Sequence, residues 1–111
     1  MTKLMSRPEE LVLLAVWQLK DNAYLIQVQD FLSKSTGRDW SVGAVFVPLE
    51  RLVRAGLAET QLGDATPERG GRRKKFYRLT KAGVDMLQEL SRVHRVMWDG
   101  FPRADLDGGR V

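Results

Sequence analysis

The first apolar segment of the chain predicts a helix that is hydrophobic on more than one face. It follows Ser6-Arg7-Pro8-Glu9, which has the form of a capping box with proline just inside the helix start, and Asp21-Asn22 ends it. Its apolar residues fall at mixed spacing: Leu11, Leu14, Ala15, Trp17 and Leu19. Such a helix in so small a chain needs two surfaces to pack on, one in its own core and one on a partner chain.

The next two apolar segments each predict an amphipathic helix. Residues 24–36 form the first of these, and Gly37 has the character of a C-terminal stop. Its buried stripe is Leu25, Val28, Phe31 and Leu32. Residues 42 to about 55 form the second, capped by Ser41 and interrupted at Pro48, where the missing backbone donor predicts a local kink. Its inward stripe is Val42, Val45, Leu49, Leu52 and Val53.

From residue 57 the hydrophobic period changes from about 3.6 to 2. Residues 57–62 and 75–79 predict the two strands of a hairpin around a polar loop rich in glycine and arginine. Thr80 can cap a last helix that runs to about Trp98. The order therefore predicts a mainly α fold with a small hairpin, a winged helix-turn-helix, in one domain over residues 1–99. Residues 100–111 lack periodicity and are expected to form a flexible tail.

The composition is that of an ordinary globular domain without disulfides. Of the 111 residues, 43% are hydrophobic and 29% charged, and the absence of cysteine excludes a disulfide framework or a cysteine-based metal site. The longest apolar stretch, residues 11–17, is too short to span a bilayer, and Glu9 and Glu10 precede it, unlike in a secretory signal. We expect a cytoplasmic protein.

Positive charge is concentrated in one short segment. Residues 68–78 carry six basic side chains against one acidic one, whereas the chain as a whole has a net charge of +4. A focused surplus indicates an anionic partner, because like charges packed this closely become favourable beside phosphates.

Two groups of residues are candidates for contact with double-stranded DNA. In a helix-turn-helix, the start of the second helix of the pair approaches base edges in the major groove. The candidates there, which lie off the buried stripe, are Ser41, Gly43, Ala44, Val47, Glu50, Arg51 and Arg54. The candidates in the wing are Arg69, Arg72, Arg73, Lys74 and Lys75. The alternatives are a plain helical bundle with a solvated outer face and a loop that binds nothing.

The last helix is longer than the core of so small a domain requires, since twenty helical residues extend about 30 Å. Its far half would expose apolar side chains in a monomer, which predicts a homodimer suited to a palindromic operator. The interface candidates are Leu11, Leu14, Leu87, Leu90, Val93, Val96, Met97, Trp98 and Phe101. The alternative is that this half folds back onto the first helix of the same chain.

Catalytic chemistry has no support in the sequence. His94 is the single histidine, lies beside Arg92 and Arg95, and has no acidic partner at helical spacing, so we expect a solvated helix residue. No carboxylate pair, phosphate loop or metal-ligand spacing is present. We therefore expect no enzyme, no cofactor and no metal.

Four segments resemble the PadR family of bacterial transcriptional regulators, from about Glu9 to Leu90. They are EELVLLAVWQL, NAYLIQVQDFL, SVGAVFVPLERLVRAGL and ERGGRRKKFYRLTKAG. The resemblance implies a winged-helix dimer joined through its terminal helices, which usually represses transcription while bound to the nucleoid and which a small molecule can release. Leu25 and Phe46 depart from the family, where glycine and tyrosine are common.

Some compact relatives bind flat apolar compounds at the dimer interface, and the corresponding effector pocket here would involve Trp17, Met97 and Trp98. The alternative is that Trp98 and Phe101 simply pack the dimer. A winged-helix module that binds another protein, without operator readout, is the competing function, although such a module needs no basic wing.

Overall fold

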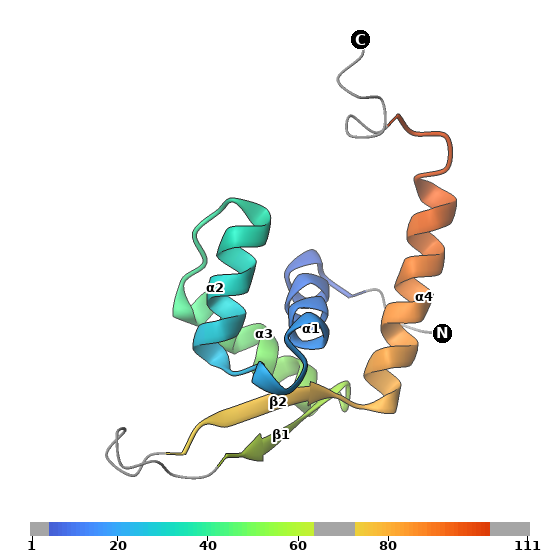
Figure 1. Cartoon of the computed structure of the whole chain (residues 1–111). Helices are drawn as coiled ribbons and strands as arrows, with labels where there is room; N and C mark the ends of the chain where they lie inside the picture. The colour runs from blue at the N-terminus through green and yellow to red at the C-terminus, as the bar shows by residue number, and fades with distance from the viewer. Residues whose placement is uncertain (1–4, 64–72, 103–111) are drawn as a thin grey trace.

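Four helices and one two-stranded hairpin make up the structure, a computed structural model that describes residues 5–63 and 73–102 (Figure 1). The elements are α1 (Arg7–Leu19), the 3-10 turn η1 (Lys20–Asn22), α2 (Leu25–Thr36), α3 (Val42–Arg54), β1 (Ala58–Leu62), β2 (Lys75–Leu79) and α4 (Lys81–Met97). Their order confirms the predicted order of helices and strands. No helix among the described residues has both the length and the hydrophobicity needed to cross a membrane.

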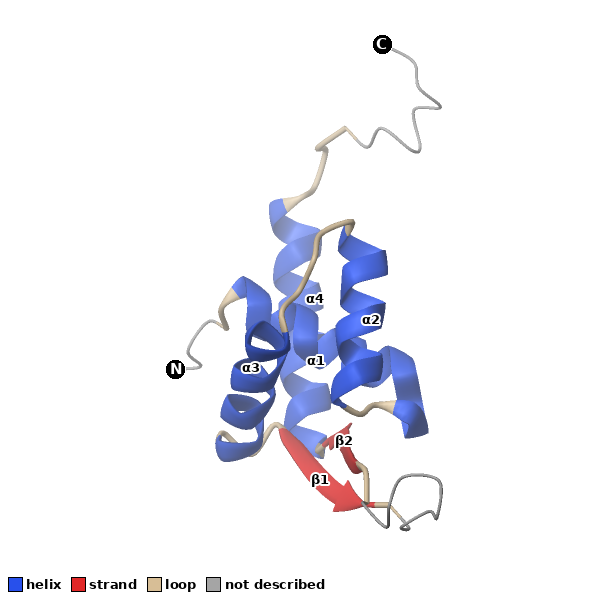
Figure 2. Cartoon of the chain, turned by 90° about the vertical axis from the view of Figure 1, so that its left-hand side faces the viewer, coloured by secondary structure: helices blue, strands red, loops and turns tan. Residues whose placement is uncertain are grey.

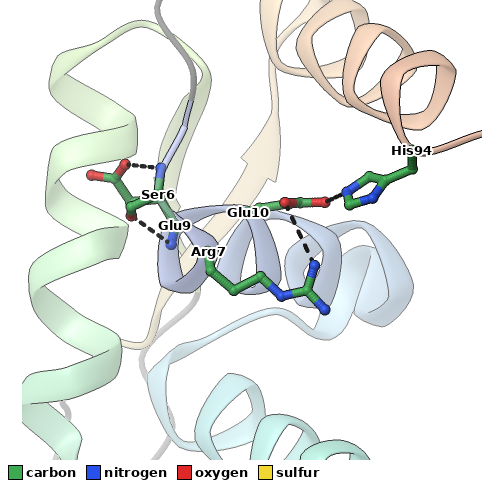
Figure 3. Close-up of polar contacts among 5 residues, drawn as sticks. All are labelled: Ser6, Arg7, Glu9, Glu10 and His94. Carbon is green, nitrogen blue, oxygen red and sulfur yellow. Dashed lines mark hydrogen bonds and ion pairs between the residues drawn. The ribbon is translucent and has the colours of Figure 1, made fainter. Parts of the chain in front are cut away.

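The start of α1 is fixed by the capping box that the sequence predicts. The Ser6 hydroxyl accepts a hydrogen bond from the Glu9 backbone N–H, and the Ser6 backbone N–H donates to the Glu9 carboxylate, both at 3.3 Å (Figure 3). Two of the donors that a helix start leaves unpaired are satisfied in this way.

The core lies where α1 packs against α2 and α3. Its largest fully buried side chains are Val12, Leu13, Val16, Val28, Leu32, Val45, Leu49 and Leu52. The predicted inward stripe of α3 was wrong at Val42, which is 48% exposed. Val42 is the first residue of α3, and the helix enters the core only with its second turn, at Val45.

Pro48 lies on the inner face of α3, and the helix is continuous from Val42 to Arg54 around it. The proline ring is buried, so it contributes apolar surface to the core where its nitrogen cannot donate a hydrogen bond. The face of α3 opposite to Pro48 remains open to solvent.

The hairpin is attached to the segment before α2 as well as to itself. β1 and β2 pair antiparallel, with Ala58 opposite Leu79 and Leu62 opposite Lys75. The Tyr77 N–H also donates to the Ala23 carbonyl at 2.8 Å, and Tyr24 forms a bridge with Phe76. The prediction that the second helix begins at Tyr24 was therefore wrong: Tyr24 is extended, because its backbone pairs with β2 instead.

α4 stands beside α1, on the side away from α2 (Figure 1). Thr80 caps it, accepting from the Gly83 N–H at 3.1 Å. A Cβ atom on Gly83 would lie 2.1 Å from the Leu57 carbonyl oxygen, so only glycine permits this close approach of α4 to the chain before β1. Leu90 is buried within its own chain. Most of the predicted tail, residues 103–111, lies outside the described residues.

His94 joins α4 to α1. Its Nε2 atom lies 2.7 Å from Oε2 of Glu10, a buried carboxylate whose other oxygen is 4.0 Å from Arg7 (Figure 3). The expectation of a solvated His94 holds only in part: its side chain is 40% exposed, and one ring nitrogen is taken up by an acidic partner that helical spacing could not reveal. The partner comes from α1, 84 residues away in the sequence.

Candidate nucleic-acid interface

α3 presents an outer face that is largely open to solvent, with β2 contacting it only at Glu50 among the described residues. Gly43, Val47, Glu50 and Arg54 recur at spacings of four, three and four, which places them on one side of the helix. Gly43, Val47 and Arg54 are exposed. Ser41, also exposed, caps the helix by accepting from the Ala44 N–H at 3.0 Å. The sequence-predicted residues of α3 are thus brought together on and beside one solvent-facing stripe.

Arg51 lies at the edge of this stripe. Its Nη1 atom is 3.9 Å from the Glu9 carboxylate, and its side chain remains largely exposed. Such a surface ion pair contributes little to stability, since solvent screens both charges. Arg51 is therefore available to an anion that approaches α3.

Trp40 fixes the turn between α2 and α3. Its carbonyl accepts from the Gln29 side chain at 2.7 Å, and its indole N–H donates to the Thr36 hydroxyl at 3.0 Å. Its backbone N–H donates to the Ser33 hydroxyl at 3.3 Å, and the ring packs against the core. The angle between the two helices is thus set by a half-buried aromatic residue with polar contacts to α2.

Glu50 connects α3 to the hairpin. Its Oε2 atom accepts from the Lys75 ammonium group at 3.0 Å and from the Tyr77 hydroxyl at 2.9 Å. The hydrogen bond from Lys75, followed by that from Tyr77, lowers the pKa of Glu50 below its ordinary value. Burial, followed by the hydrogen bond to Glu50, raises the pKa of Tyr77.

The described basic residues of the wing differ in their surroundings. Arg73 is exposed, whereas the Lys74 ammonium group lies 4.1 Å from the centre of the Tyr24 ring. Lys75 is held by Glu50, and Arg78 pairs with Glu59 across the hairpin at 2.5 Å. Arg69 and Arg72 lie outside the described residues. Sequence reasoning grouped these cations by proximity alone and missed the partners of Lys74 and Lys75, which come from distant elements.

The start of α3 lies on the same side of the molecule as the end of β1 and the start of β2. Figure 1 shows both on the left, and Figure 2 views the chain from that side. The contact between Glu50 and β2 requires the same closeness. The exposed start of α3 and the basic hairpin therefore lie on one side of the molecule.

The end of α4 carries exposed apolar side chains. Met97 is 75% and Trp98 56% exposed, and Trp98 meets the Phe101 ring edge-on at 5.0 Å. Helical spacing places Met97 on the same face of α4 as Met86 and Val93. It places Trp98 on the same face as Leu87. Val96 is also exposed, but it lies on the same face of α4 as the charged residues Asp85, Glu89 and Arg92. The apolar surface of α4 thus continues through Met97 and Trp98, and Val96 lies on its polar face.

An apolar groove of about 360 Å³ separates α1 from the first half of α4. It is lined by Leu14, Trp17, Leu79, Val84, Leu87, Gln88 and Ser91. α1 and α4 run in opposite directions, because Glu10 meets His94 near one end and Trp17 lies near Val84 at the other. Within one chain, the structure therefore does not bring Trp17 together with Met97 and Trp98.

No group of three histidine, cysteine, aspartate or glutamate side chains able to hold a metal ion occurs in residues 5–63 and 73–102.

Three helices followed by a hairpin and a long last helix, with α3 exposed beside the hairpin, define a winged helix-turn-helix protein. Residues 13–89, more than half of the chain, match the family described as the transcriptional regulator PadR-like family. The chain belongs to this family, whose members regulate transcription and are not enzymes.

Solved structures of PadR proteins share the fold. A PadR family transcriptional regulator from Eggerthella lenta is 27% identical, with a TM-score of 0.65 and 81% of this chain and 76% of that chain covered. A PadR family regulator from Clostridium difficile is 20% identical, with a TM-score of 0.67 and coverage of 83% and 91%. A PadR-like transcription factor from Bacteroides fragilis is 22% identical, with a TM-score of 0.67 and coverage of 82% and 85%. No curated protein matches the chain.

Proposed function

We propose that this protein is a sequence-specific transcriptional repressor that binds a palindromic operator as a homodimer, on chromosomal DNA in the cytoplasm. The observation that carries the proposal is that the start of α3 and the hairpin lie on one side of the molecule, joined through Glu50, and that α3 exposes Gly43, Val47 and Arg54. A duplex that receives α3 in its major groove also meets the hairpin.

α3 supplies the base-reading surface in this proposal. Gly43 and Ala44 leave room for close approach of the backbone to DNA, and Val47 can contact a thymine methyl group. Arg51 and Arg54 extend from the same helix toward the phosphates or base edges. Arg73, together with Arg69 and Arg72, supplies the wing's attraction to the backbone, which is largely blind to sequence.

Dimerisation is argued from the end of α4, which is exposed in the part of the chain that the structure describes. Exposed Met97, Trp98 and Phe101 form an apolar surface that a second copy would cover, and two-fold symmetry is the commonest arrangement of such pairs. A two-fold dimer presents two α3 helices to half-sites about 34–36 Å apart or a multiple of that distance. An inverted repeat is therefore the expected operator.

Selection of duplexes from a random DNA pool, followed by fluorescence anisotropy at two salt concentrations, tests the DNA-binding proposal. We expect an enriched inverted repeat, and an affinity that falls roughly 10³–10⁵-fold between about 50 and 200 mM salt if about 6–10 phosphates are contacted. Failure to enrich any sequence, with weak binding that salt does not change, would contradict the proposal and favour a protein-binding module.

The groove beside Trp17 supports a further part of this proposal, namely release of DNA by a small apolar effector. Within one chain, Met97 and Trp98 do not reach Trp17. In this proposal, the same two residues of a second copy therefore close the groove. A panel of flat aromatic compounds, titrated against tryptophan fluorescence and DNA binding, tests this. A binder that quenches fluorescence without weakening DNA binding would contradict the effector role.

A further inference from the structure

Glu50 occupies an unusual place for a carboxylate, on the helix face that the proposed function turns toward DNA. It is the one acidic residue of α3, between Val42 and Arg54. An unpaired carboxylate at this position would repel phosphate. Its charge is instead used within the protein, where a single oxygen accepts hydrogen bonds from Lys75 and Tyr77.

The two donors come from one face of β2. Lys75 and Tyr77 are two residues apart, so their side chains leave the strand on the same side, toward α3. Tyr77 is buried, and its hydroxyl would lack this partner if Glu50 were removed. The Glu50 side chain itself is only 29% exposed. The contact is thus partly shielded from water, which strengthens charge-assisted hydrogen bonds.

The base of the hairpin has a separate attachment on its other side. There the Tyr77 N–H donates to the Ala23 carbonyl, and the Tyr24 ring meets the Phe76 ring edge-on at 5.4 Å. These contacts fix β2 to the start of α2. On the side of β2 that faces α3, the polar contacts among the described residues are those of Glu50 with Lys75 and Tyr77.

We propose that Glu50 is a positioning residue, which sets the angle between the wing and the recognition helix α3 through Lys75 and Tyr77 without itself reading a base. The inference rests on the proposed DNA-binding function. Sequence discrimination requires α3 and the wing to meet the duplex together, in one register. Removal of the Glu50 carboxylate therefore lowers discrimination between sequences more than it lowers attraction to DNA in general.

The test compares E50A, Y77F and the matched control E59A, which removes the same charge from the exposed pair between Glu59 and Arg78 on the hairpin. Affinity is measured for the duplex selected with the wild-type protein and for a scrambled duplex of equal length and composition. We expect E50A and Y77F to lower the ratio of the two affinities about tenfold, the scale of one hydrogen bond to a charged group. We expect E59A to preserve the ratio.

The outcomes separate the inference from the function on which it rests. If the wild-type protein enriches no duplex, the proposed function fails. If it does and the ratio for E50A equals that for E59A, the positioning role is overturned. A merely stabilising role would lower both affinities of E50A by one factor and leave their ratio unchanged. Should E50A prove unfolded by circular dichroism, Y77F decides, because phenylalanine preserves the buried ring and removes only the hydroxyl.

Discussion

Tyr77 shows how a single side chain takes part in both the core and the proposed DNA-binding surface. Its ring is buried beneath the hairpin and its hydroxyl donates to Glu50. Burial disfavours the phenolate, and a neighbouring carboxylate disfavours it further, so both raise the pKa of Tyr77. The residue is therefore held as a neutral donor at any physiological pH.

The alkaline titration of Tyr77 should be displaced upward. The near-ultraviolet absorbance of wild-type protein minus that of Y77F isolates its phenolate, which should form at a pH well above the ordinary pKa of 10.0. Because the folded-state pKa is raised, the stability that Tyr77 contributes is fully present below pH 10 and is lost as pH rises beyond it. A transition at pH 10 would show that the hydroxyl is solvated.

At the scale of elements, helix-capping residues and glycine stops in the sequence predicted most of the helix ends. Ser6, Ser41 and Thr80 cap the helices that they were predicted to cap, and Gly37 follows α2 as expected. The predicted helix start at Tyr24 was wrong because this residue pairs with β2, which is distant in the sequence.

The site was predictable only in part, for the same reason. Helical periodicity identified the exposed residues of α3 because it is a property of nearby positions. The partners of Glu50 lie 25 and 27 residues away, and that of Glu10 lies 84 away. One sequence contains no signal that couples such positions, so these contacts required the structure.

Gly83 lies against the Leu57 carbonyl where α4 begins, and its replacement should destabilise the fold. In G83A the new methyl group would overlap the Leu57 carbonyl, and we expect a loss of about 1–3 kcal/mol in the free energy of unfolding. Urea denaturation measures it. The control is G43A, whose methyl group meets open space and should be neutral or stabilise by up to about 1 kcal/mol. Equal effects would contradict the proposed clash.

At the scale of the whole molecule, the proposed interfaces lie on different elements. DNA would meet α3 and the hairpin, whereas a second copy would meet the end of α4. Variants on one surface should therefore leave the other intact, which allows DNA binding and dimerisation to be tested independently.

M97E should convert the proposed dimer to a monomer that remains folded. Met97 is largely exposed in one chain, so the substitution does not disturb the core, but it would bury an unpaired charge between two copies. The control is the neighbouring V96E, which falls on the charged face with Glu89 and Arg92. Sedimentation should show a monomer for M97E and a dimer for V96E. A dimeric M97E would place the interface elsewhere.

Replacing Arg72 and Arg73 with alanine should weaken binding to all duplexes by a similar factor. The slope of log affinity against log salt should become shallower by about 0.9 for each phosphate that the variant no longer neutralises. The K81A variant, on the exposed first turn of α4, removes a cation from outside the wing and should leave the slope unchanged. An unaltered slope in the double variant would mean that the wing does not touch phosphate.

The attachment of α4 has a consequence for how operators could diverge. The body holds this helix near its start through Gly83, in its middle through Leu90 and again at His94 through Glu10, while Met97 and Trp98 extend beyond. In a dimer joined at Met97 and Trp98, α4 would connect the interface to the body of each protomer. A slight change in the tilt of α4 would therefore change the distance between the two α3 helices. A substitution at Glu10 or His94 would then retune the gap between half-sites and leave the bases read within each half-site unchanged.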